Sequence, residues 1–120
     1  MSEYNVIGLM SGTSLDGVDL AFCTFTKNKG WSYELIQAVT YPYAQKWRDI
    51  LANVQDLPER ILQDVDLELG LYYSQSIENF INEFQLIPDF VSSHGHTALH
   101  RPEEGLTLQI GNGEVMAREL

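Results

Sequence analysis

The alternation of apolar and polar residues predicts three consecutive strands in the first third of the chain. Residues 4–10 form a short apolar run, which is typical of a buried strand. Apolar side chains alternate with polar or small ones in residues 18–26, and again in residues 31–41. The polar turn 27–30 separates these two segments. Three strands joined by tight turns form an antiparallel meander.

The apolar spacing then changes to three and four residues, which predicts helices. Residues 44–54 follow this spacing, and Pro58 lies near the first turn of a longer helix whose apolar positions continue to Phe84. Acidic residues fall mostly on the other face of the longer helix, and we interpret them as a solvated surface. They are Asp64, Asp66, Glu68, Glu78 and Glu83.

Two further strands follow the long helix. Residues 90–93 predict a fourth strand, and its position after a long crossover favours parallel pairing. Residues 106–110 predict a short fifth strand, and residues 111–113 then lead into a helix that carries Val115 and Met116. This order of elements predicts an α/β domain with a mixed sheet.

The composition is that of a folded, acidic domain. The chain has 120 residues, of which 44% are hydrophobic, and a formal net charge of -10. This length and apolar content suffice for one domain with a core. The charge argues against nucleic acid as a partner, because phosphate backbones bind through Lys and Arg, and against anionic membrane surfaces. A small phosphorylated ligand stays open, since backbone N–H groups and a metal ion can hold it.

Three features of the sequence favour the cytoplasm. The single cysteine, Cys23, excludes an internal disulfide and fits a reducing compartment. No apolar run reaches the roughly 18 residues of a membrane span. Residues 1–8 lack the basic start and long apolar stretch of a signal peptide. We therefore expect a cytoplasmic protein that does not bind membranes.

The segment between the first two strands, MSGTSLDGVD at residues 10–19, holds more polar groups than a hairpin requires. It is not a nucleophile elbow, because Asp16 stands where the second glycine of that motif belongs. It is not a Walker loop either, because Val18 and Asp19 replace the lysine and the hydroxyl residue.

A glycine turn that cradles phosphates explains this composition better. Gly12 and Gly17 can adopt positive φ and let phosphates approach the backbone, and Thr13 and Ser14 supply hydroxyl donors. A carboxylate would repel a bare phosphate, so Asp16 or Asp19 makes sense here mainly as a ligand of Mg²⁺. The alternative is an elaborate hairpin in which Asp16 and Gly17 cap the turn.

All three histidines of the chain lie within residues 94–100. If the fourth strand continues, His94 and His96 share one face. Together with His100 they could form a three-nitrogen site of the kind that binds zinc. A stand-alone metal-binding α/β module is therefore the rival hypothesis. Polar loop histidines without any ligand are the third interpretation.

Three segments carry a family resemblance: VIGLMSGTSLDGVDLAF, SSHGHTALHRP and TLQIGNGEVMARE. They occur in order and span nearly the whole chain. Together they resemble the motifs of the anhydro-N-acetylmuramic acid kinases, which belong to the superfamily of sugar kinases, heat-shock protein 70 and actin. The resemblance implies a ribonuclease H-like mixed sheet, as the N-terminal portion of a two-lobed kinase.

The resemblance also implies an ATP site. In that superfamily the first hairpin turn is a phosphate loop, and Asp16 would be its magnesium-linked acid, directly or through water. The residues that would line the ATP phosphates are Gly12, Thr13, Ser14, Leu15, Asp16, Gly17, Val18 and Asp19.

The second and third motifs imply a sugar site. His94 and Thr97 would bind the substrate or support the groups that do. His96 is placed in the same site, although the family pattern has Gln there, and a neutral imidazole offers a narrower set of hydrogen bonds than an amide. Arg118 matches a family arginine that would face the lactyl carboxylate of the sugar as a bidentate fork. An exposed surface arginine is the alternative reading of Arg118.

The implied reaction opens the 1,6-anhydro bond of anhydro-N-acetylmuramic acid with water and phosphorylates O6 from ATP, in peptidoglycan recycling. The expected general base is an aspartate in a family segment that follows the position of Leu120. No catalytic residue is therefore assigned. We expect residues 1–120 to be the N-terminal part of the first lobe and inactive alone. Apolar surface exposed by truncation would favour self-association, with a homodimer as the simplest form.

Overall fold

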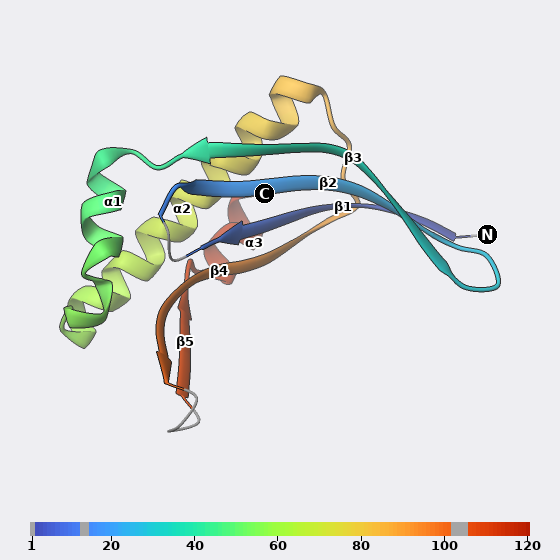
Figure 1. The fold of residues 1–120 in the computed structure, drawn as a ribbon. Helices are drawn as coiled ribbons and strands as arrows, with labels where there is room; N and C mark the ends of the chain where they lie inside the picture. The colour runs from blue at the N-terminus through green and yellow to red at the C-terminus, as the bar shows by residue number, and fades with distance from the viewer. Residues whose placement is uncertain (1, 13–14, 102–105) are drawn as a thin grey trace.

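Five strands form one mixed sheet in the order β3-β2-β1-β4-β5 (Figure 1). The computed structural model of the chain describes residues 2–12, 15–101 and 106–120, and leaves the side chains of residues 97–109 outside its description. The first three strands are the predicted antiparallel meander, and β4 is parallel to β1, as expected from the long crossover. The strands are β1 (Ser2–Ser11), β2 (Gly17–Lys27), β3 (Trp31–Pro42), β4 (Phe90–Arg101) and β5 (Leu106–Ile110).

The helices lie on one face of this sheet (Figure 1). The long helix begins directly after Pro58, which has no N–H to leave unpaired at that position. It ends at Gln85, whose left-handed φ of 51° closes the last turn. The helical elements are α1 (Gln45–Ala52), the 3-10 turn η1 (Val54–Asp56), α2 (Glu59–Phe84) and α3 (Gly113–Glu119).

The core lies between α2 and the central strands. Ile7 of β1 and its partner Phe22 of β2 face the helices, and so do the paired residues Leu9 and Leu20. Leu69, Tyr73, Ile77 and Phe80 of α2 are fully enclosed against them. Burial of a side chain of this size contributes about 1.5–3 kcal/mol, so this layer supplies most of the stability of the fold.

The strand pattern departs from simple alternation at two bulges. Between β2 and β3 the register shifts after Phe22, so that Val39 faces the helices whereas Leu35 lies exposed on the other face. The predicted fourth strand, 90–93, continues to Arg101 through a second irregularity at Gly95. The sequence hides this extension because the extra residue at a bulge interrupts the period of two.

No helix in the part of the chain that the structure describes is long and apolar enough to cross a membrane.

Candidate functional site

The loop between β1 and β2 is a tight turn held by its own backbone. The Leu15 amide donates to the Gly12 carbonyl at 3.2 Å, and Leu15 adopts a left-handed φ of 59°. Gly17 does not use the positive φ that a glycine can adopt, because it begins the strand β2. A Cβ there would lie 2.4 Å from the Tyr41 carbonyl oxygen, so the position admits only glycine because β3 packs so closely. Thr13 and Ser14 lie outside the described residues.

Two carboxylates flank this turn and differ in their surroundings. Asp16 is exposed at the end of the loop. Asp19, also exposed, accepts a hydrogen bond at 2.5 Å from the Thr40 hydroxyl of β3. Val18 between them is fully buried, so Asp19 is the exposed position among the first four residues of β2. The arrangement leaves one carboxylate tied to the sheet and one open to solvent beside the loop.

Four buried polar side chains meet where β1 ends and the loop begins. The Ser11 hydroxyl lies 2.8 Å from Nδ1 of His96 on β4, and it is also hydrogen-bonded to the Tyr43 hydroxyl. The Tyr43 hydroxyl lies 2.8 Å from that of Tyr73 on α2. We call this set, Ser11, Tyr43, Tyr73 and His96, the hydroxyl network. It joins β1, the start of the β3–α1 connection, α2 and β4 at one point.

Burial sets the charge of the hydroxyl network. It lowers the pKa of His96 below the usual 6.5, because a charged imidazole loses its hydration there. Burial also raises the pKa of Tyr43 and, with the neighbouring Tyr43 hydroxyl adding to the effect, the pKa of Tyr73. All four side chains are therefore uncharged at neutral pH. Among the described residues, every buried side-chain nitrogen or oxygen has a hydrogen-bond partner.

His94 and His96 lie on opposite faces of the sheet, so the prediction that they share a face is wrong. Gly95 between them has φ of 66°, and the β1–β4 register gains one residue there. His94 lies exposed on the open face and lines a cavity with Met10 and Asp19. His96 is only 2% exposed on the helix side.

The placement of His94 and His96 on opposite faces also argues against the proposed zinc site. Within residues 2–12, 15–96 and 110–120, no group of three His, Cys, Asp or Glu side chains could hold a metal ion. The side chains of Thr97 and His100 lie outside the described residues. The separation of His94 from His96 by the sheet means that a metal bound to one of them does not reach the other.

The turn from β5 to α3 is fastened to α2 by Asp66. The Asp66 carboxylate accepts from the Gly111 amide at 2.9 Å and from the Asn112 side-chain amide at 3.0 Å. Asn112 caps α3 by accepting from the Val115 amide at 3.0 Å. The interpretation of Asp66 as part of a solvated helix face is wrong. A signal that could have revealed it is the GNG turn, whose amides need an acceptor when the turn packs on a helix. Arg118, which this turn positions, lies exposed in the last turn of α3.

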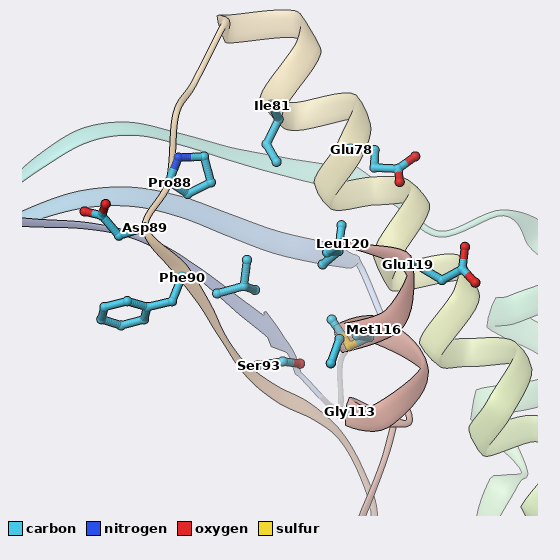
Figure 2. A pocket seen from close by; sticks show the side chains of 12 residues that line it. Glu78, Ile81, Pro88, Asp89, Phe90, Ser93, Gly113, Met116, Glu119 and Leu120 are labelled. Atoms are coloured by element: carbon cyan, nitrogen blue, oxygen red, sulfur yellow. The ribbon is translucent and has the colours of Figure 1, made fainter.

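In the part of the chain that the structure describes, cavities border both faces of the sheet. One, of about 580 Å³, lies on the open face over the small residues Gly8, Ala21 and Ala38. The other, of about 550 Å³, lies between α2, β4 and α3 (Figure 2). Its walls are apolar side chains such as Ile81 and Met116, with acidic groups around them.

Known proteins match this chain along nearly all of its length. A model of the anhydro-N-acetylmuramic acid kinase family matches residues 4–120. Curated relatives bear that same name, among them the following three. The Brucella canis protein is 37% identical over 125 residues, which cover 94% of this chain and 33% of that protein. The Acaryochloris marina protein is 38% identical over 122 residues, covering 96% of this chain and 32% of the relative. The Rhizobium etli protein is 36% identical over 124 residues, covering 93% and 33%.

The extent of these matches has two consequences. The chain spans about a third of the length of the curated relatives it matches. The match includes the β1–β2 loop, the β4 histidine segment and the β5–α3 turn, so it confirms the resemblance carried by the three sequence motifs. The chain therefore belongs to the anhydro-N-acetylmuramic acid kinase family.

Proposed function

We propose that this chain forms the phosphate-binding part of a kinase for anhydro-N-acetylmuramic acid. The reaction opens the 1,6-anhydro bond with water and transfers the γ-phosphoryl group of ATP to O6. The observation that supports it best is the β1–β2 loop, a short glycine-bordered turn with an exposed carboxylate, in a chain that belongs to this kinase family.

The loop offers the two kinds of group that a triphosphate needs. Its backbone N–H groups can donate to phosphate oxygens, as in other turns that bind anions. Asp16 can hold Mg²⁺, directly or through water, and bound Mg²⁺ neutralises charge on the transferred phosphoryl group. Magnesium sites in kinases use one or two carboxylates together with the phosphates, so one exposed aspartate fits this chemistry. Asp19 is held against Thr40 and is assigned to supporting the turn.

On the sugar side we assign Arg118 to substrate binding, because it is exposed in the last turn of α3. His94, exposed on the face of the sheet opposite the helices, keeps its assignment to the sugar site as a hypothesis. Arg118 can bind a carboxylate with two parallel hydrogen bonds. Thr97 keeps its assignment to the same site as a hypothesis. Water attack on the anhydro carbon requires a general base, and none of the described residues is assigned to that role. The chain alone is therefore expected to release no ADP from ATP and the anhydro sugar. We place the kinase in the cytoplasm.

Magnesium-dependent nucleotide binding tests this function. Titration of the chain with a non-hydrolysable ATP analogue, followed calorimetrically, should show binding that requires Mg²⁺. Asp16→Asn should weaken it by about tenfold, since the metal loses its one charged protein ligand. Glu114→Gln, which removes an exposed carboxylate from the first turn of α3, is the matched control and should bind as wild type does. Equal affinities of wild type and Asp16→Asn at saturating Mg²⁺ would remove the role proposed for this loop.

A further inference from the structure

The hydroxyl network adjoins the start of the proposed phosphate loop, residues 12–17. Ser11 is the last residue of β1, and the loop begins at the next residue. The Ser11 side chain is 7% exposed, and it contacts one partner from β4 and one from the residue that follows β3. The position of the loop's first residue is thus tied to two neighbouring segments through a single hydroxyl group.

Counting protons fixes the direction of the hydrogen bonds in this network. Three hydroxyl groups and one imidazole nitrogen share three hydrogen bonds in a row. The Tyr73 hydroxyl is fully enclosed, is hydrogen-bonded to Tyr43 at 2.8 Å and also interacts with the Ser11 hydroxyl. Its proton therefore needs an acceptor inside the network, and Tyr43 at 2.8 Å supplies one. Tyr43 then donates to Ser11, and Ser11 donates to His96.

This direction favours one state of the imidazole. In it Nδ1 of His96 accepts from Ser11, and the ring is neutral with its proton on Nε2. The three hydrogen bonds already take up the three hydroxyl protons, so an added proton on Nδ1 would leave one buried hydroxyl proton without an acceptor among them. The burial of His96 and the lowered pKa of its ring agree with this state.

We infer that His96 is a positioning residue: as a neutral acceptor it holds the Ser11 hydroxyl, and through it the start of the phosphate loop. Its role is to fix the backbone to which phosphates bind, while the ring itself lies below the loop. The consequence for nucleotide affinity rests on the proposed function, whereas the state of the ring and the order of the loop do not.

The side chain needed at residue 96 is therefore a neutral acceptor. Glutamine can supply one through its carbonyl oxygen, whereas leucine of similar volume cannot. The amide of Leu15 reports on the loop, because it donates to the Gly12 carbonyl across the turn. Loss of the acceptor should loosen Ser11 and make this amide open more often.

Two NMR measurements on the 120-residue chain test the inference. Nitrogen-15 spectra of the imidazole groups at pH 7 should show His96 with its proton on Nε2 and an unprotonated Nδ1. In hydrogen exchange, the Leu15 amide of His96→Leu should exchange about tenfold faster than in wild type, and His96→Gln should restore slow exchange. Ser92→Leu, an exposed change on the same strand, is the control and should leave Leu15 unaffected.

Several results would overturn the inference. These are a proton on Nδ1 of His96, unchanged Leu15 exchange in His96→Leu, or equally fast exchange in His96→Gln and His96→Leu. If His96→Leu does not fold, Ser11→Ala supplies the same test, since it removes the donor and should speed Leu15 exchange and shift the His96 ring signals. Failure of nucleotide binding with these NMR results intact would count against the proposed function alone.

Discussion

The two ends of the sheet differ in composition and burial: one has buried, hydrogen-bonded polar groups and the other has exposed aromatic side chains. At the loop end, where β1 ends and β2 begins, lie buried hydroxyls, a buried imidazole and glycines packed closely against backbone. At the other end, the β2–β3 turn and the N-terminus project beyond the helices (Figure 1). This end carries exposed aromatic side chains that pack against one another, such as Tyr4 with Trp31 and Phe90, and Phe25 with Tyr33.

The two ends therefore differ in how strongly they depend on the exact positions of their side chains. Side chains at the loop end have fixed hydrogen-bond partners and no room to shift, which suits a surface that must match a ligand. Aromatic rings at the projecting end are 62% exposed for Trp31 and 75% for Tyr33, so little depends on their exact position. The same type of substitution should therefore lower the free energy of unfolding much more at the loop end than at the projecting end.

The largest expected effect comes from Gly95→Ala. A Cβ at this position would lie 2.3 Å from the Ile110 carbonyl oxygen, and the backbone φ of 66° is strained for alanine. We expect the free energy of unfolding to fall by about 3 kcal/mol, measured by urea denaturation. Gly30→Ala at the projecting end is the control, because nothing lies within 4 Å of its Cβ, and it should change stability by less than about 1 kcal/mol. Equal losses in both variants would contradict the contrast between the ends.

A smaller effect is expected when single hydroxyl groups are removed. Tyr73→Phe takes away the first donor of the hydroxyl network and should lower the free energy of unfolding by about 1 kcal/mol. Tyr33→Phe removes the same atom from a side chain that is 75% exposed, and should leave stability unchanged within error. An unchanged free energy of unfolding in Tyr73→Phe would contradict a stabilising role of the hydroxyl network.

The smallest expected effect is a pH dependence at the loop end. The pKa of His96 is lowered in the fold relative to 6.5, so the unfolded chain binds its proton more readily. The contribution of neutral His96 to the free energy of unfolding is therefore fully present above pH 6.5 and is lost as the pH falls below that value. Tyr43 and Tyr73, which are linked to the ring through Ser11, keep their protons throughout this range because their pKa values are raised, and Asp19 acts on Tyr43 only from a distance.

The measurement is the difference in thermal midpoint between wild type and His96→Gln from pH 7.5 to 5. As the pH falls, the thermal midpoint of wild type should decrease relative to that of His96→Gln, because glutamine takes up no proton. Parallel curves would mean that His96 charges as easily in the fold as in the unfolded chain.

The regular parts of the fold could be predicted from the sequence. The meander, the start of α2 after Pro58 and the parallel pairing of β4 all follow from periodicity, proline chemistry and crossover length. Departures from a regular period could not be predicted. The bulge at Gly95 puts His96 on the face opposite to His94, and a lone glycine in a strand pattern gives no sign of which face follows.

The candidate site divides in the same way. Its loop could be recognised because a local run of glycines, hydroxyls and carboxylates is visible in the sequence. The hydroxyl network could not, because its members are 85 residues apart between Ser11 and His96, and 30 apart between Tyr43 and Tyr73. Asp66 was missed for a similar reason, since its partners Gly111 and Asn112 lie on a distant turn. Contacts made only in the folded chain leave no pattern in the sequence.

The position of bound phosphates tests the central claim most directly. A crystal of the chain soaked with Mg²⁺ and a non-hydrolysable ATP analogue should show the phosphates against the backbone of residues 12–17, with the metal beside Asp16. Phosphates bound elsewhere, for example over the small residues of the open sheet face, with the β1–β2 loop closed on itself, would contradict the account.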